Sequence, residues 1–338
     1  MLRKETLLAL GYCLLSLLTS IGAAYHEGTL LDPVKISYQG RDLVLHPYIH
    51  NFSTLIDFAL LNPLAIFFIL RARRHRVTVS EKVSKSLGVS TYHYIGISIL
   101  CALLAFMAMR FYVGGFLVGD YFSETIGLGP DNKPFITITG WIVFTWTWLF
   151  IAVLFWGCAE QGIHVFDIVR WNKDDIQYHP FDSDEAGGQK FLMVPSLHFT
   201  YAMISVLMIF VVFYVQDSVA QIEESNRLWG FGIYLLIVGP LFSIPFMKIH
   251  RLMYAHRKQI LKKAYDVLDP KDEKSADDPV NHYLKVAERY KALAESLPVW
   301  PLSWKNYGLP VASLVSASVP IIKKMGISLL PMMKTLVG

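Results

Sequence analysis

Long apolar stretches constrain this 338-residue chain more than any other feature of its sequence. A helix needs about 20 mostly apolar residues to cross the hydrocarbon core of a bilayer. Hydrophobic residues make up 54% of the chain and charged residues 17%, and the hydrophobic ones come in blocks rather than dispersed as in a soluble core. We therefore expect an all-α, polytopic membrane helical bundle with about six spanning helices, at residues 6–24, 52–70, 94–119, 138–158, 194–216 and 229–247.

The first apolar stretch has two interpretations. Arg3 and Lys4, the apolar run behind them and the small residues at Ala23 and Ala24 together resemble a cleaved signal peptide. The run from Leu7 to Ala24 is longer than the 7–15 residues that are usual for the apolar core of such a peptide. The length favours a helix that is retained in the protein.

Lysine and arginine residues predict the orientation, because cytoplasmic segments of membrane proteins carry an excess of them. If both termini are cytoplasmic, 26 of the 31 lysines and arginines fall in inner segments. We therefore expect residues 1–249 to form a transmembrane bundle with cytoplasmic loops at 71–93 and 159–193. A cytoplasmic helical module at 250–300 and an apolar interfacial or re-entrant tail at 301–338 follow.

Several residues inside the expected spans are unusual for a lipid environment. Asp57 and Arg110 both lie near the outer interface, where they could line a polar pathway, form a structural ion pair, or let Arg110 reach the surface. The sequence "VGPLFSIPF" places Gly239, Pro240 and Pro245 in the inner half of the last span. Two prolines remove two helical hydrogen bonds there, which indicates either a gate hinge or a static kink.

The cytoplasmic segment "HPFDSDEAGGQKFL" gathers a histidine, three acids and a glycine pair between two spans. Hard cations could use the acids, but their spacing does not match a calcium-binding loop. The glycines could expose backbone amides to an anion, and the simplest interpretation is a turn with paired acids. The candidate ligand-binding or coupling residues of this loop are His179, Asp182, Asp184, Glu185, Gly187 and Gly188.

A basic amphipathic helix is predicted directly after the last span, in "MKIHRLMYAHRKQILKKAYDVLD". It is suited to lie against anionic lipid headgroups, and it could also bind a phosphorylated ligand or nucleic acid. Because the acids of the loop oppose an anion, an anion site there would need help from this helix. The basic residues that we expect to contribute are His250, Arg251, Arg257 and Lys258.

The sequence contains none of the enzyme signatures for which we searched. There is no G-x-S-x-G, no H-E-x-x-H, no phosphate-binding loop and no dinucleotide fingerprint. No cysteine spacing suits zinc. We therefore predict no catalytic residues, no metal site and no cofactor, and an enzymatic role is unsupported.

The order His-Pro, Asp and Gly-Gly before a membrane helix, followed by the basic "KIHRLMYAHRKQIL" helix and "LPVWP", resembles a group of uncharacterised bacterial multi-pass membrane proteins. Their loop has the form His-Pro-Asp, a few residues, Gly-Gly-Leu. This chain departs from that form with Phe181 before Asp182 and Gln189 in place of leucine. By analogy, the resemblance implies a membrane effector of the antiphage-defence type in a bacterial inner membrane.

Two functions follow from these features. The first is an oligomeric ion channel or pore-type effector, gated through its cytoplasmic face by a nucleotide or oligonucleotide signal. The alternative is a membrane-embedded enzyme or transporter with a site at the inner membrane surface, built from His179, Asp182, Asp184 and His250. The expected partners are the lipid bilayer, other copies of the chain, a small anionic ligand or oligonucleotide, and a protein at the cytoplasmic module.

Overall fold

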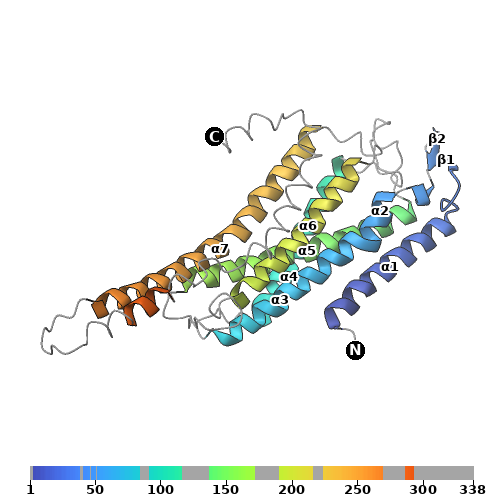
Figure 1. Cartoon of the computed structure of the whole chain (residues 1–338). Coiled ribbons are helices and arrows are strands. Elements are labelled where there is room, and N and C mark those ends of the chain that lie inside the picture. Colours follow the sequence, from blue (N-terminus) through green and yellow to red (C-terminus); the bar gives the residue numbers. More distant parts are fainter. Residues whose placement is uncertain are drawn as a thin grey trace, which may run out of the picture.

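The computed structural model is a bundle of long helices (Figure 1). Its helices are α1 (Lys4–His26), α2 (Phe52–Ile56), α3 (Asn62–Lys82), α4 (Thr91–Gly115), α5 (Ile138–Arg170), α6 (Lys190–Val215) and α7 (Glu224–Leu268). A π-helical turn (Asp57–Leu61) joins α2 to α3. The structure describes residues 3–38, 41–45, 47–50, 52–83, 91–115, 137–171, 190–215, 224–268 and 286–292.

Four helical segments in the described chain are long and apolar enough to cross a membrane, which confirms that the chain has the character of a membrane protein. They are Lys4–His26, Phe52–Glu81, Ile138–Arg170 and Phe191–Ile209. A shorter apolar segment, Ile95–Met107, lies within α4, and the sixth expected span lies within α7. The helical bundle is thus confirmed with four candidate spans, and a count of six stays a prediction.

The distribution of side chains also suits lipid rather than water. Large apolar residues lie exposed on the outside of the bundle, including Leu18 of α1 at 66% and Met107 of α4 at 67%. Small polar residues such as Ser16 and Ser20 of α1 are fully buried. A soluble protein rarely exposes so many large apolar side chains, because each of them would be in contact with water.

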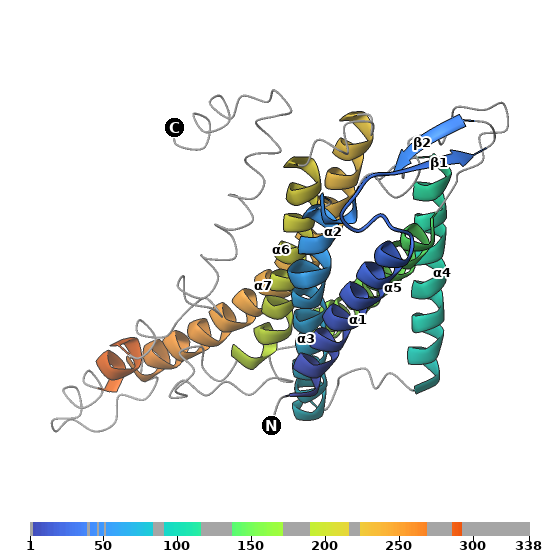
Figure 2. The same ribbon diagram turned by 90° about the vertical axis from the view of Figure 1, so that its right-hand side faces the viewer.

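A β-hairpin lies at the end of the bundle opposite the N-terminus (Figure 2). Strands β1 (Val34–Tyr38) and β2 (Arg41–Leu45) pair antiparallel, with Tyr38 opposite Arg41. Our sequence analysis did not predict it. The hairpin follows α1, and the backbone of Tyr48 and Ile49 then returns the chain to the end of α1 by hydrogen bonds to Thr29 and Leu30.

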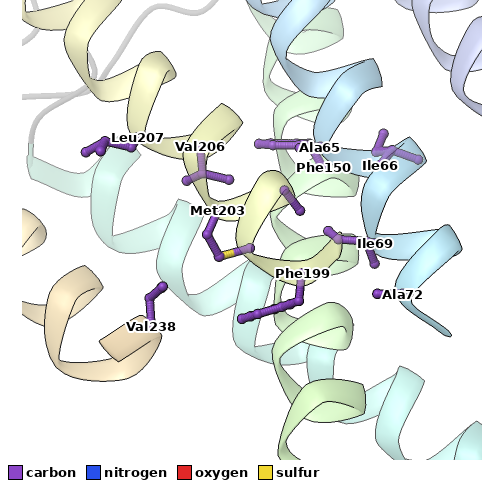
Figure 3. Packing of buried hydrophobic residues seen from close by; sticks show 11 residues of the cluster. Ala65, Ile66, Ile69, Ala72, Phe150, Phe199, Met203, Val206, Leu207 and Val238 are labelled. Atoms are coloured by element: carbon purple, nitrogen blue, oxygen red, sulfur yellow. The ribbon is translucent and has the colours of Figure 1, made fainter. Parts of the chain in front are cut away.

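Helices α3 and α6 pack most extensively and form the apolar centre of the bundle (Figure 3). This central apolar layer also takes one side chain each from α5 and α7. Its buried members are Ala65, Ile66, Ile69, Ala72, Phe150, Phe199, Ala202, Met203, Val206, Leu207 and Val238. Small residues allow the helices to approach closely. At Gly157 of α5 an added Cβ would lie only 3.0 Å from Cγ2 of Ile69.

Helices α3 and α5 continue into segments that we expected to be cytoplasmic loops. α3 extends to Lys82 within the predicted loop 71–93, and α5 extends to Arg170 within the predicted loop 159–193. Both extensions are helical because their side chains are buried against neighbouring helices: Val79 and Ile168 are 2% and 0% exposed. The bundle therefore continues beyond the apolar stretches that revealed it.

Prolines leave backbone carbonyls without their usual helical partners, and neighbouring helices supply donors in two such places. Pro63 cannot donate to the carbonyl of Ala59, and the thiol of Cys13 in α1 lies 3.5 Å from that oxygen. Pro245 cannot donate to the carbonyl of Leu241, and Gln161 Nε2 of α5 donates to it at 3.1 Å. Each contact joins two helices through a carbonyl that a proline has released.

Candidate functional site

A buried ion pair joins α3 and α5 at the end of the bundle that carries the N-terminus (Figure 2), which we expected to face the cytoplasm and call the inner end. Arg76 Nε lies 2.7 Å from Glu160 Oε2, and these residues are 4% and 5% exposed. Arg73 Nε lies 3.7 Å from the other carboxylate oxygen, Oε1. The guanidinium of Arg73 is more exposed and stacks on Trp156 at 4.9 Å from the ring centroid. Two positive groups thus share one buried carboxylate.

Gln161 follows the ion pair and joins three helices. Its Nε2 donates to Ser196 Oγ of α6 at 2.8 Å and to the carbonyl of Leu241 in α7 at 3.1 Å. Both amide hydrogens are used, so the side chain of Gln161 is fixed between α6 and α7. The acceptor on α7 is the carbonyl that Pro245 leaves without a helical donor.

His164 and Asp167 continue the polar face of α5 towards its C-terminal end. His164 is 1% exposed, and its Nε2 donates to the carbonyl of Leu192 at 3.0 Å. A carbonyl only accepts, so Nε2 carries the proton and the imidazole is held in that tautomer. Asp167 is 2% exposed. We call Arg73, Arg76, Glu160, Gln161, His164 and Asp167 the inner polar layer.

Apolar side chains enclose the inner polar layer from both sides. The central apolar layer lies on its outer side. A second apolar cluster lies on its inner side, with members from α3, the α5 end, α6 and α7: Val79, Val83, Ile168, Trp171, Leu192, Met193, Ile249, Leu252 and Met253. A cavity of about 10 Å³ beside Arg76 and Glu160 is at the lower limit for one water molecule. Within the described residues, the space beside Arg76 and Glu160 thus holds at most about one water molecule.

A second set of polar residues lies in the outer half of the bundle. Asp57 and Asn62 are 4% and 3% exposed, and Asn62 Nδ2 lies 3.5 Å from the hydroxyl of Tyr12. Tyr12 in turn donates to the carbonyl of Trp146 at 3.0 Å. We call Tyr12, Asp57 and Asn62 the outer polar layer. At 1.5 Å per residue, Asp57 and Arg76 lie about 28 Å apart along the α3 axis, close to the thickness of a hydrocarbon core.

The predicted coupling residues are only partly within the described chain. His179, Asp182, Asp184, Glu185, Gly187 and Gly188 lie outside the described residues. The other four lie on α7, where Arg251 and Lys258 are exposed and His250 and Arg257 are partly buried. A joint site between the loop and α7 stays a prediction.

The predicted pore or gate residues are separated by the fold. Asp57 is buried in the outer polar layer. The backbone of Arg110 lies in α4, which packs on α5, but its side chain lies outside the described residues, so the pair with Asp57 stays a prediction. Gly239 and Pro240 are exposed on α7, Pro245 is buried, and α7 remains a continuous helix through both prolines.

Our sequence analysis missed the inner polar layer because its residues lie in segments that we expected to be loops. A signal was present. Glu160, His164 and Asp167 are spaced four and three residues apart, so they share one face of a helix directly after an apolar stretch. Arg73 and Arg76 show the same spacing after the second stretch. Polar residues with helical periodicity beside an apolar span indicate a buried polar face.

Comparison with known proteins adds no further assignment: no family model, no curated protein and no solved structure matches this chain. Within the described residues, no group of three or more His, Cys, Asp or Glu side chains is placed to hold a metal ion. The two polar layers and the helices that carry them are therefore the features that bear on function.

Proposed function

We propose that this protein is an ion channel or pore-type membrane effector that is gated through its cytoplasmic face. The observation that carries the proposal is the buried Arg76–Glu160 ion pair, enclosed between two apolar clusters at the inner end of the bundle. Charged side chains inside membrane bundles commonly mark ion pathways, and apolar constrictions next to them close such pathways by excluding water. In this proposal the described structure represents the closed state.

Helix α7 supplies a route from a cytoplasmic ligand to this closed layer. Gln161 joins the inner polar layer to α7 at Leu241, and the same helix continues past the bundle to Arg251, Arg257 and Lys258. An anionic nucleotide or oligonucleotide that binds these residues together with the loop at 179–188 would displace α7. The hydrogen bond at Leu241 would then transmit this displacement to the inner polar layer.

The finer architecture belongs to the same proposal. It includes six membrane crossings, cytoplasmic termini, a cytoplasmic C-terminal region, a bacterial inner-membrane location and assembly of several copies. A role in antiphage defence rests on the resemblance of the loop and the basic helix to bacterial multi-pass proteins. The charge bias of the sequence and the four candidate spans support the membrane part.

Flux through liposomes tests the gate without knowledge of the ligand. Glu160→Gln leaves Arg76 buried without its carboxylate, so we expect the closed layer to loosen and basal potassium flux to rise at least tenfold over the wild type. Arg76→Met combined with Glu160→Met replaces the buried pair by apolar side chains and should not raise flux. The exchange Arg76→Glu with Glu160→Arg keeps the pair and should return flux to the wild-type level.

Equal basal flux for all four proteins would contradict the proposal, provided that each variant is folded and inserted to the same extent. Thermal unfolding shows that each variant is folded, and protection of the protein from protease in the liposomes shows that it is inserted. A rise in flux with Glu160→Gln that the charge exchange does not reverse would also contradict a gate that is formed by this pair.

The alternative function is a transporter or membrane enzyme with its site at the inner surface. One observation favours it: Glu160, His164 and Asp167 form a continuous buried face of titratable groups on α5, as in proton-relay proteins. Flux by a transporter saturates with substrate and is coupled to a second ion. Loss of such saturable uptake on alanine substitution of His179, Asp182, Asp184 and His250 would favour the alternative over the channel.

A further inference from the structure

The outer polar layer contains two buried oxygen atoms that have no hydrogen-bond partner within the described chain. They are Oδ1 of Asp57 and Oδ1 of Asn62. Both side chains are more than nine-tenths buried. A buried acceptor without a donor costs about 1–3 kcal/mol, and a carboxylate in the hydrocarbon costs about 2.5–3.5 kcal/mol on insertion scales. A positively charged group bound beside this turn would satisfy both oxygens.

The backbone brings these two side chains to the same place. The amide of Asn62 donates to the carbonyl of Asp57, five residues earlier, which defines the π-helical turn. The turn forms where Pro63 cannot provide the next helical donor. Both side chains approach Tyr12 of α1, because Asn62 Nδ2 bonds to its hydroxyl and Asp57 interacts with it electrostatically. π-helical turns are frequently found at functional sites.

The described side chains around Asp57 supply no positive charge. Arg73 and Arg76 pair with Glu160, and Arg74 pairs with Glu5 at 3.2 Å, all towards the other end of α3. Asp57 is 4% exposed, and no basic side chain forms an ion pair with it within the described residues. Asn62 Nδ2 donates to the hydroxyl of Tyr12, and Oδ1 of Asp57 accepts no hydrogen bond from it.

We propose that Asp57, Asn62 and Tyr12 form a binding site for a monovalent cation of the sodium type. Carboxylate, amide and hydroxyl oxygens are the ligands that hard cations prefer. One carboxylate neutralises one monovalent charge, whereas a divalent ion would leave a net charge in an apolar environment. Interrupted helices of membrane transporters also bind sodium, there through backbone carbonyls, and the π-helical turn here likewise interrupts an apolar helix. The inference deepens the proposed function, because the site lies on the outer side of the proposed gate.

Sodium binding to the purified full chain tests this site independently of flux. The midpoint of thermal unfolding is measured in detergent as sodium chloride replaces choline chloride at constant ionic strength. We expect a saturable rise of about 3 °C or more for the wild type. Asp57→Asn should abolish the sodium-dependent rise. Asn62→Ala should lower the apparent affinity for sodium at least tenfold. Asp32→Asn, the same chemical change at an exposed site, should leave it intact.

Other outcomes would overturn the site. A wild-type protein whose midpoint is the same in sodium and choline has no such site. An equal sodium-dependent rise in Asp57→Asn places the ion elsewhere. Stabilisation of the wild type by acid alone, absent in Asp57→Asn, assigns the carboxyl to a proton rather than sodium. A sodium-dependent rise that emerges only in Arg110→Gln identifies Arg110 as the resident positive group.

Binding and flux can fail separately, which keeps the two proposals distinct. A sodium-dependent rise in a protein without flux in any variant would retain the site and contradict the channel. Flux that increases in Glu160→Gln, in a protein without a sodium-dependent rise, would retain the gate and contradict the site.

Discussion

The inner and outer polar layers meet the same physical problem in different ways. In the inner layer, the chain supplies both charges, since Glu160 lies against Arg76 and Arg73. In the outer layer, Asp57 and Asn62 each keep a buried oxygen without a partner in the described chain. A pair that is complete within the protein stabilises one conformation of the helices. A buried carboxylate without a partner in the described chain makes the stability of the fold sensitive to a cation or proton that binds from solution.

The largest effect in this comparison is expected at the inner pair. Arg76→Ala removes the closest partner of Glu160 and leaves a buried carboxylate with only the more exposed Arg73. We expect the free energy of unfolding to fall by about 3–5 kcal/mol, as found when buried pairs are broken. Replacement of both residues by methionine should recover most of that loss, because neither buried charge remains and Arg73 is partly exposed to solvent. Chemical unfolding in detergent, with all three proteins compared in one buffer, measures both values.

A smaller effect is expected from the close helix contact that brings the inner pair together. Gly157→Ala places a Cβ 3.0–3.2 Å from three side-chain atoms of Ile69, so α3 and α5 have to separate or Ile69 has to move. We expect a loss of about 1–3 kcal/mol. Gly162→Ala on the same helix is the matched control, because its added Cβ has no neighbour within 4 Å. Ile69→Ala removes all three of these atoms, so if the clash is the cause, the two substitutions together should cost less than the sum of their separate losses.

The smallest effect, with the opposite sign, is expected in the outer layer. Asp57→Asn replaces a buried carboxyl whose charged form burial disfavours and which forms no ion pair within the described chain, so in sodium-free buffer it should increase the free energy of unfolding by about 1–2 kcal/mol. Thermal unfolding in choline chloride measures this change in stability. A loss of stability instead would mean that Asp57 already has an internal positive partner, and the contrast between the layers would disappear.

The fold was predictable where the signal is local. Spanning helices at α1, α3, α5 and α6 follow from continuous apolar stretches, since burial in lipid depends on each stretch alone. The hairpin was missed although alternating apolar residues at Val34, Ile36, Leu43 and Leu45 flank a two-residue connection that ends in glycine. Each strand is short beside the long helical stretches, so its pattern carried little weight.

The candidate site was predictable only in part, because its residues are far apart in the sequence. Asp57 was identified from its own position in an apolar stretch. The partnership of Arg76 with Glu160 spans 84 residues and depends on how α3 packs against α5, which no local pattern determines. The contact of Gln161 with Leu241, 80 residues later in the chain, likewise depends on packing. It uses the carbonyl that Pro245 leaves without a helical donor. Tertiary packing creates both contacts.

The continuity of α7 through Pro245 has a mechanical consequence. Twenty-three residues separate Pro245 from Leu268, which corresponds to about 35 Å of rigid helix at 1.5 Å per residue. A tilt of about 5° at Pro245 would therefore displace the far end by about 3 Å, roughly one hydrogen-bond length. In the reverse direction, a movement of several ångströms at the Leu268 end of α7 becomes a small rotation of the helix beside Gln161. That reduction suits a contact only 3.1 Å long, which breaks when displaced by a fraction of an ångström.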